Sequence, residues 1–341
     1  VAGVDEADFM KNDGTRIFVI SGQKLHAVKS WPANQLAEQS ALELEGYPTQ
    51  MYLDEKNRVV VFSSVYTKYD GFNDGSSGGG GIAADSALCA PGSCGFYGNT
   101  TKVTVVDVSN IAALKVTSEY YLPGSYANSR RIDSSVRMVL SDYFRWPTTV
   151  KWWPTSNDPN LWQNPTKLAA ELDRLKVENE AILRAQTLDK WLPLPKRKLA
   201  DGRIVDVQYD CRDFSRSNAP VHMGLATVAT LNLDNLDAGP SRTSIVGQTG
   251  EIYASKNSLY IATPHWWWWP APGQTDYTYF HKFDLSDKNK AQYVASGGVE
   301  GHIVDQFSMD EDKGYFRVAT TISTRVPDKM NPMNRWGTLE L

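Results

Sequence analysis

The segment NRVVVFS at residues 57–63 is the clearest indication of the fold, because four similar segments occur elsewhere in the chain. Each copy is a run of β-branched or aromatic residues that ends in a small residue and follows a turn rich in Asp, Asn or Gly. The copies are TRIFVIS (15–21), NRVVVFS (57–63), SVRMVLS (135–141), NSLYIAT (257–263) and GYFRVAT (314–320). Such short, continuously apolar runs are typical of strands that are covered on both faces. The repetition predicts several similar β-sheet units.

A second kind of strand follows each of the first four copies after a gap of variable length. These strands are KLHAVKS (24–30), KVTVVDVSN (102–110), ATVATLNLDN (226–235) and TYFHKFDLSD (278–287). A recurring strand–turn–strand unit is typical of a β-propeller, in which four-stranded blades stack around an axis and bury each other's faces. A β-sandwich is the alternative, but it would need hairpins without a repeating pattern. We expect an all-β fold, a single β-propeller over residues 1–341 with a helical insertion.

Unequal spacing between the copies predicts two insertions into the propeller. The first covers residues 66–99 and contains the run GSSGGGG. The second covers residues 143–219 and contains one amphipathic helix, at about 164–186. Asn164 suits the N-cap of this helix and Pro165 its first turn. We expect the apolar face of the helix to pack on the flank of the propeller.

Composition and charge exclude several classes of protein. Among 341 residues, 35 are Lys or Arg and 39 are Asp or Glu, which gives a net charge of −4. Nucleic acid is therefore not expected as a partner, because phosphate binding needs clustered cations. Hydrophobic residues make up 41% of the chain, too many for a wholly disordered protein. No apolar run approaches the roughly 18 residues of a membrane helix, so we expect no transmembrane segment.

Several long segments resemble a known family. The opening VAGVDEADFMKNDGTRIFVISGQKLHAVKSW, the stretch GHIVDQFSMDEDKGYFRVATT and the pair HWWWW and HKFDLS are similar to the secreted beta-propeller domain proteins of bacteria and archaea. The segments TLDKWLP and DCRDF resemble the same family. The resemblance covers the whole chain in the same order. It implies a propeller fold and export, to a secreted, cell-surface or periplasmic location, and it implies no activity.

The resemblance also predicts blades beyond those that this chain encodes. Members of the family continue past the segment that resembles NRWGTLEL with further strands. An unclosed propeller would expose sheet edges at its first and last blades. We therefore expect this chain to be part of a longer protein or of a two-chain ring, and a second polypeptide that completes the propeller is a predicted partner.

The chain contains three cysteines. Cys89 and Cys94 are separated by a short turn in the sequence CAPGSC, so a disulfide between them is feasible and would imply an oxidising compartment. Two free thiols are the alternative. Cys211, in the segment DCRDF, is expected to be a buried thiol rather than a nucleophile.

Two groups of carboxylates could bind Ca²⁺, which takes six to eight oxygen ligands. The first is Asp5, Glu6 and Asp8, and the second is Asp70 and Asp74 in a loop that lacks the closing Glu of an EF-hand. The alternative for the first group is turn capping and pairing with Arg from a neighbouring blade. Calcium is the one cofactor that the sequence suggests.

Tryptophan is the distinctive residue of this chain, which contains 11. Trp266, Trp267, Trp268 and Trp269 are consecutive, while Trp152 and Trp153 lie in the second insertion. One interpretation is that these rings pack against the insertion. The other is an exposed aromatic surface that binds a carbohydrate or a partner protein, since both are recognised by Trp.

These observations favour a secreted propeller scaffold that binds a protein or glycan, or a structural subunit of an extracellular assembly, without catalysis. The alternative is a propeller enzyme of the hydrolase or lyase type that uses carboxylates near the axis, with or without calcium. No nucleophile motif or dense metal-ligand cluster is present in the sequence. Fold alone cannot choose between these functions.

Overall fold

The computed structural model describes residues 3–70, 72–73, 95–143, 145–154, 158–219, 223–265, 275–326 and 337–340. For residues 67–70, 72–73, 95–98, 189–190, 323–326 and 337–340 it describes the backbone alone. The chain divides into two units, which are described separately. We call residues 1–65, 100–142 and 195–341 the blade unit, and residues 66–99 and 143–194 the inserted unit.

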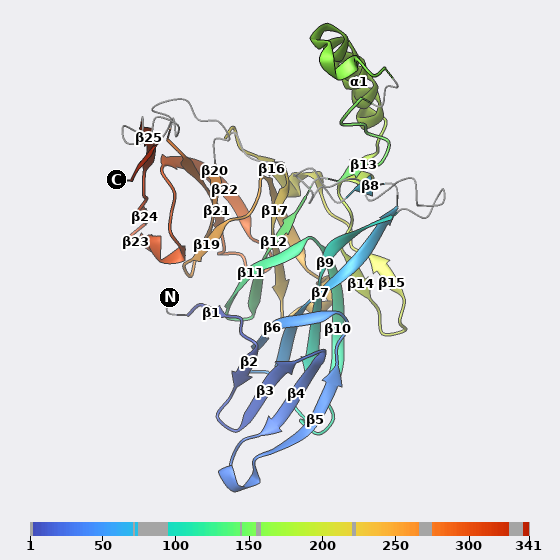
Figure 1. Ribbon diagram of the computed structural model, residues 1–341. Coiled ribbons are helices and arrows are strands. Elements are labelled where there is room, and N and C mark those ends of the chain that lie inside the picture. The colour runs from blue at the N-terminus through green and yellow to red at the C-terminus, as the bar shows by residue number, and fades with distance from the viewer. Residues whose placement is uncertain are drawn as a thin grey trace. The chain divides into compact units, whose positions relative to one another are not determined.

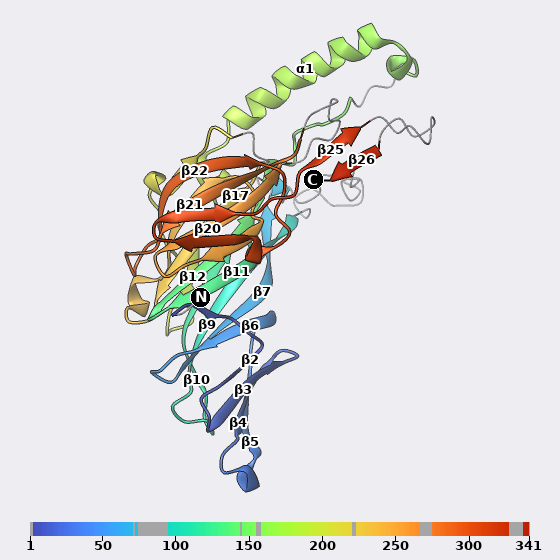
Figure 2. The same ribbon diagram turned by 90° about the vertical axis from the view of Figure 1, so that its left-hand side faces the viewer.

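Four antiparallel sheets of four strands follow one another along the chain (Figure 1). Blade 1 contains β2 (Met10–Asn12), β3 (Arg16–Ser21), β4 (Lys24–Lys29) and β5 (Ala37–Glu43). Blade 2 contains β6 (Tyr47–Leu53), β7 (Arg58–Asp70), β9 (Gly95–Asp107) and β10 (Lys115–Pro123). Blade 3 contains β11 (Ser125–Ile132), β12 (Ser135–Asp142), β17 (Leu225–Asn232) and β18 (Ser241–Val246). Blade 4 contains β19 (Glu251–Ala254), β20 (Ser258–His265), β21 (Tyr277–Asp284) and β22 (Gln292–Glu300), three of which lie side by side in Figure 2.

Shorter elements extend or connect these sheets. Blade 5 is a two-stranded sheet of β23 (Met309–Asp312) and β24 (Tyr315–Val318). The outer strand β10 is covered by β14 (Lys196–Lys198) and β15 (Ile204–Asp206), and β18 by the parallel strand β16 (Phe214–Arg216), so neither edge is left open. Strand β1 (Asp5–Glu6) pairs with β11. Two further pairs are β8 (Phe72–Asn73) with β13 (Trp146–Pro147), and β25 (Ser323–Val326) with β26 (Gly337–Glu340). The short helices are η1 (Ala33–Gln35), η2 (Leu161–Gln163), η3 (Cys211–Asp213), η4 (Leu236–Ala238), η5 (Gln306–Ser308) and α2 (Leu188–Trp191).

The repeated segments occupy equivalent places in the blades. Each of the five copies of the first strand type lies in the second strand of a blade. In chain order these strands are β3, β7, β12, β20 and β24. The four strands of the second type form the third strand of blades 1 to 4, and they include β4, β9, β17 and β21. The prediction of a propeller with a helical insertion is confirmed.

The second strand of an interior blade is largely apolar because it faces two different cores. In β7, Val59 and Val61 lie in the core between blades 1 and 2, while Val60 and Phe62 lie in the core between blades 2 and 3. All four side chains are fully buried. Since alternate residues of a strand point to opposite faces, a continuous apolar run is what a doubly covered strand requires. Each such side chain contributes about 1.5–3 kcal/mol of burial free energy.

Four separate hydrophobic cores fill the four interfaces between consecutive blades. Blades 3 and 4 share a core that includes Val228 and Ile261, and blades 4 and 5 share one that includes Phe280 and Met309. A separate core between each pair of consecutive sheets is typical of a propeller. It excludes the β-sandwich, in which two sheets would share one core.

A repeated arginine joins neighbouring blades near the start of the second strand. Arg16 of blade 1 donates a hydrogen bond to the backbone carbonyl of Val108 in blade 2, with an N···O distance of 2.9 Å. Arg58 of blade 2 donates to the carbonyl of Leu233 in blade 3. Arg137 of blade 3 donates to the carbonyl of Leu285 in blade 4 at 3.0 Å. All three acceptors follow the third strand of their blade, so the same contact orients successive blades.

Glycine begins the crossover from one blade to the next. Gly46 and Gly124 follow the last strands of blades 1 and 2, with φ angles of +82° and +102°. A Cβ at Gly46 would lie 2.4 Å from the carbonyl oxygen of Ser64, and one at Gly124 would lie 2.9 Å from that of Ser141. The crossover therefore needs glycine for both its backbone conformation and its close approach to the second strand.

The inserted unit contains one long helix, α1 (Pro165–Arg184). Asn164 caps it by accepting a hydrogen bond from the backbone N–H of Lys167 at 3.1 Å. Leu175 is the buried residue of this helix, whereas Leu172 is 39% exposed, so the expected apolar face is only partly covered. Among the described residues, no helix is long and apolar enough to cross a membrane.

Candidate functional site

Five tryptophans of the inserted unit form what we call the tryptophan surface. Three of them are largely exposed: Trp152 at 55%, Trp153 at 69% and Trp162 at 56%. Trp146 and Trp191 are half-buried; Trp146 contacts the rings of both Trp152 and Trp191. Large exposed aromatic rings that gather at one place are typical of interaction surfaces rather than of folding cores.

The ring contacts form two groups, one around Trp146 and one between Trp153 and Trp162, and each contact is edge-on or tilted. Trp146 is 4.9 Å from Trp152 and 6.1 Å from Trp191 between ring centroids, with interplanar angles of 81° and 85°. Trp153 and Trp162 are 6.4 Å apart at 51°. Such T-shaped contacts are favourable arrangements for aromatic pairs and fix the rings in place. The surface is therefore ordered but not flat.

Helix α1 holds the loop that carries the exposed rings. The side chain of Asn179 accepts a hydrogen bond from the backbone N–H of Lys151 at 3.1 Å and donates one to the carbonyl of Lys151 at 2.8 Å. The Lys151 ammonium also lies 3.6 Å from Glu178. Because both backbone groups of residue 151 are bound, the two tryptophans that follow it have a fixed starting point.

Sequence reasoning identified Trp152 and Trp153 but did not identify Trp191 and Asn179 as parts of this arrangement. Trp191 lies in α2, and Asn179 is one of several polar residues on α1. Neither has a local pattern that sets it apart. The only signal in the sequence is the abundance of Trp in the insertion.

The run Trp266–Trp269 lies outside the described residues, so both interpretations of it stay predictions. Its place in the topology is informative nonetheless, because the run lies between β20 and β21, the second and third strands of blade 4. The segments between β7 and β9, and between β12 and β17, connect the second and third strands of blades 2 and 3. The two predicted insertions and the tryptophan run therefore lie in the same connection of their blades.

The acidic N-terminal segment has protein partners in this structure. Asp5 pairs with Arg131 of blade 3 at 3.2 Å, and Glu6 pairs with Arg130 at 3.1 Å. Asp8 accepts a hydrogen bond from the backbone N–H of its neighbour at 2.7 Å. Within the part of the chain that the structure describes, no three His, Cys, Asp or Glu side chains converge as a metal site would need. Calcium binding by this segment stays a prediction.

Several other predicted site residues fall where the structure gives no description. Asp74, Cys89 and Cys94 lie outside the described residues, and for Asp70 only the backbone is described. The second calcium loop and the disulfide therefore stay predictions.

The prediction that Cys211 is buried is wrong, since its thiol is free and exposed. Cys211 begins the short helix η3, and it is Asp213, two residues later, that takes the buried position. The Asp213 side chain accepts a hydrogen bond from the backbone N–H of Asp210 at 3.0 Å. This capping interaction, rather than thiol burial, orders the segment.

Two tyrosines on the first strands of blades 2 and 3, one buried and one partly buried, have no signature in the sequence. The hydroxyl of Tyr52 lies 2.8 Å from that of Ser129, which also lies 2.7 Å from the hydroxyl of Tyr126. Burial raises the pKa of Tyr126 to about 12 and the pKa of Tyr52 further. Both phenols therefore stay protonated at neutral pH and serve as structural hydrogen-bond groups rather than as bases.

Comparison with known proteins adds a family and a relative. A family model described as "Beta propeller domain" matches residues 1–336. A protein of Methanocaldococcus jannaschii that is described as uncharacterized is 22% identical over 363 residues, which cover 97% of this chain and 50% of that protein. The chain thus spans about half the length of this curated relative.

Proposed function

Because this chain belongs to the beta propeller domain family, we propose that it is a non-catalytic, exported scaffold that binds a partner protein through the tryptophan surface. In this proposal the blade unit supplies a stable body, and the inserted unit supplies the contact. Exposure of Trp152, Trp153 and Trp162 by 55–69% is the observation that carries the proposal. Indole rings are over-represented among the residues that supply most of the binding free energy at protein interfaces.

The tilt between the rings favours a protein over a polysaccharide as the partner. A flat sugar chain stacks best on rings that share one plane. Trp153 and Trp162 are inclined by 51°, and Trp146 and Trp152 by 81°. A protein partner can instead insert side chains between tilted rings, in well-packed pockets of the kind that binding hot spots occupy.

Glu55, which follows the first strand of blade 2, is held in its charged form. The Arg131 guanidinium donates hydrogen bonds of 3.2–3.3 Å to the Glu55 carboxylate and lowers the pKa of that carboxyl. A hydrolase or lyase would need a general acid, for which a raised pKa is typical. Glu55 is stabilised as a carboxylate, opposite to this requirement.

Site-specific photo-crosslinking in cells that express the natural protein tests the proposal. A benzophenone amino acid replaces Trp153, and in a matched control it replaces Lys115, an exposed residue of β10. We expect illumination to give one defined adduct with a protein from position 153 and none from position 115. Mass spectrometry of the adduct identifies the partner.

Competition with unlabelled protein distinguishes specific binding from nonspecific hydrophobic adsorption. Excess unlabelled wild-type chain should suppress the adduct, and excess Trp152→Ala/Trp162→Ala variant should not. Equal labelling from positions 153 and 115, an adduct that consists of polysaccharide, or suppression by the variant would each overturn the proposal.

A second observation favours a partner at another place, namely further blades. In the segment around blade 5, Phe307 is 85% exposed, Val304 75% and Tyr315 75%. We propose that blades from a second polypeptide cover these side chains, in the way that each interior blade covers its neighbour. We expect native mass spectrometry of the particle purified from its source to detect a second polypeptide. The substitution Phe307→Ser should release that polypeptide. A particle that holds no other polypeptide contradicts the proposal.

A further inference from the structure

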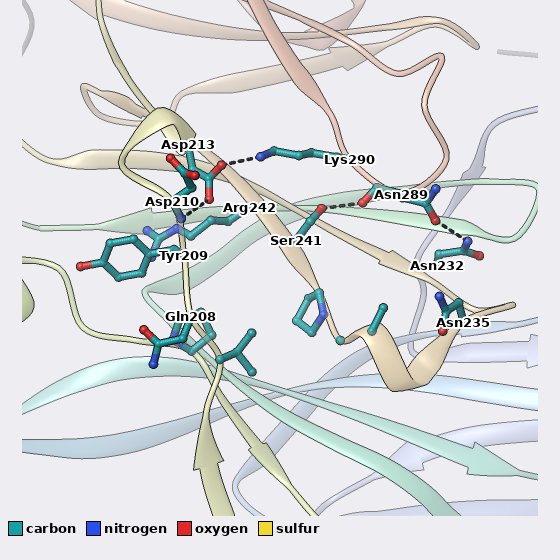
Figure 3. A pocket seen from close by; sticks show the side chains of 15 residues that line it. Gln208, Tyr209, Asp210, Asp213, Asn232, Asn235, Ser241, Arg242, Asn289 and Lys290 are labelled. Carbon is teal, nitrogen blue, oxygen red and sulfur yellow. Dashed lines mark hydrogen bonds and ion pairs between the residues drawn. The ribbon is translucent and has the colours of Figure 1, made fainter.

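A pocket in the blade unit shares no residue with the tryptophan surface and is not used by the function proposed above (Figure 3). It has a volume of about 340 Å³. Three parts of the chain form its walls: the segment that precedes β16, the connection between β17 and β18, and the connection between β21 and β22. Pockets that hold small ligands begin at about 300 Å³, so this one is large enough for a small ligand.

The first wall is held by a reciprocal cap. Asp210 accepts a hydrogen bond from the backbone N–H of Arg212 at 2.8 Å, while Asp213 accepts one from the backbone N–H of Asp210 at 3.0 Å. Asp213 is buried and forms an ion pair with Lys290 from the opposite wall. The carboxylates of the pocket are therefore fixed in position and already have cationic partners, as Figure 3 shows for the Asp213–Lys290 pair.

The opposite wall is held by amide and hydroxyl groups. Asn232 donates from its side-chain nitrogen to the side-chain oxygen of Asn289 at 2.8 Å. Ser241 donates to the backbone carbonyl of Asn289 at 2.6 Å. These bonds tie blade 3 to the loop of blade 4. The wall is thus rigid before any ligand arrives.

Two exposed amides at the rim still have hydrogen-bonding capacity. The side chains of Gln208 and Asn235 form no hydrogen bond within the described ranges, and both line the pocket from opposite sides (Figure 3). Each offers a carbonyl oxygen and an NH₂ group. The apolar part of the lining includes Pro195, Val207 and Pro240.

The charges of the lining cancel. Asp210 and Asp213 are negative, and Arg242 and Lys290 are positive. The ring faces of Tyr209 and Phe214 lie 5.5 Å and 4.8 Å from the Arg242 guanidinium. A charged ligand would gain no net attraction from such a lining. A neutral ligand that carries both donors and acceptors, and that has an apolar face, would match it.

We propose that this pocket binds a neutral saccharide of one or two rings. Each sugar hydroxyl both donates and accepts, as the amides of Gln208 and Asn235 do, and the C–H face of the ring suits the proline and valine side chains. The saccharide is either free in solution or the end of a longer glycan. This inference does not depend on the protein-binding function of the tryptophan surface.

Isothermal titration calorimetry of the full chain tests the proposal. The probes are glucose, galactose, mannose, N-acetylglucosamine, cellobiose and maltose, with adenosine and uridine as neutral non-sugar probes. A printed array of longer glycans distinguishes a glycan end from a free sugar. We expect at least one saccharide to bind and neither nucleoside to do so.

Variants of the rim place the binding in this pocket. Gln208→Ala and Asn235→Ala change exposed residues and should leave Tm unchanged, while the pair together weakens sugar binding by about tenfold or more. Lys288→Ala, in the same loop as Asn289, and Trp153→Ala should bind the sugar as the wild type does. If no saccharide binds, if the nucleosides bind equally well, or if the double variant binds with unchanged affinity, the proposal is wrong.

Discussion

The blade unit and the inserted unit treat their most conspicuous side chains in opposite ways. Within the blades, the charged Arg137 is only 1% exposed and its guanidinium donates to the backbone carbonyls of Leu285 and Asp287. In the inserted unit, the apolar ring of Trp153 is 69% exposed. Burying a charge and exposing an indole both oppose the usual partition between core and surface.

The two placements have different physical consequences. A buried charge is tolerable only where hydrogen bonds replace its water, and the cost of losing them makes it a strong constraint on geometry. An exposed indole contributes little to folding but retains the apolar area that a partner can cover. The blade unit therefore uses an arginine to fix neighbouring blades, while the inserted unit keeps apolar rings exposed, as the proposed protein-binding function requires.

The largest expected effect is on the stability of the blade unit. Arg137→Ala leaves the carbonyls of Leu285 and Asp287 without their charged donor and opens a cavity. We expect the free energy of unfolding to fall by about 3–5 kcal/mol, as chemical denaturation measures it. Arg203→Ala is the matched control, because the Arg203 side chain is 71% exposed, and it should have no measurable effect. An equal effect of the two changes would refute the role given to Arg137.

The next effect concerns a buried histidine of blade 4. His281 is fully buried, its Nδ1 lies 2.6 Å from the hydroxyl of Ser296, and burial lowers its pKa to about 4. In the unfolded chain this imidazole takes up a proton near pH 6.5, whereas in the folded chain it does so only near pH 4. Its contribution to the free energy of unfolding is therefore complete above pH 6.5 and is lost as the pH falls toward 4. The loss that this residue causes should reach about 3 kcal/mol.

Denaturation of wild type and His281→Gln at neutral pH and at pH near 4 isolates this effect, because the other titrating groups are common to both. The variant should lose less stability on acidification than the wild type. Parallel pH profiles of the two proteins would contradict a neutral buried imidazole.

A smaller effect sharpens the comparison by testing whether blade crossovers are as constrained as blade interfaces. Gly46→Ala places a methyl group 2.4 Å from the carbonyl oxygen of Ser64 in a left-handed conformation. We expect a loss of about 2–3 kcal/mol in the free energy of unfolding. Gly202→Ala has a similar φ of +84° but no neighbour within 4 Å of its new Cβ, so it should cost only about 1 kcal/mol. Equal losses would show that the close approach adds nothing.

The smallest effect tests the other side of the comparison. Trp153→Ala should change Tm very little, with a free-energy change of about 0.5 kcal/mol or less, because the ring is mostly in water. Trp146→Ala should cost more, since that ring contacts both Trp152 and Trp191. Unfolding of the Trp153 variant would mean that the ring belongs to a core and would remove the basis of the tryptophan surface.

The amino-acid sequence by itself determined the blades. The segment NRVVVFS is apolar on both faces, because alternation along a strand places Val59 and Val60 on opposite faces. Such a segment therefore predicts a strand that is covered on both sides. The same holds for the start of α1, where Asn164 and Pro165 are local signals that need no distant contact. Repetition of such local patterns was enough to predict a propeller with a helical insertion.

Only the tertiary structure decided what meets across those elements. Arg137 resembles any strand arginine until the next blade brings the carbonyl of Leu285 to it, 148 residues away in sequence. Cys211 is exposed against expectation, while Asp213 is buried where a loop 77 residues away supplies Lys290. The walls of the pocket and the rings of the tryptophan surface likewise come from separate segments. Local patterns are set by backbone geometry over a few residues, whereas these contacts depend on the three-dimensional path of the whole chain.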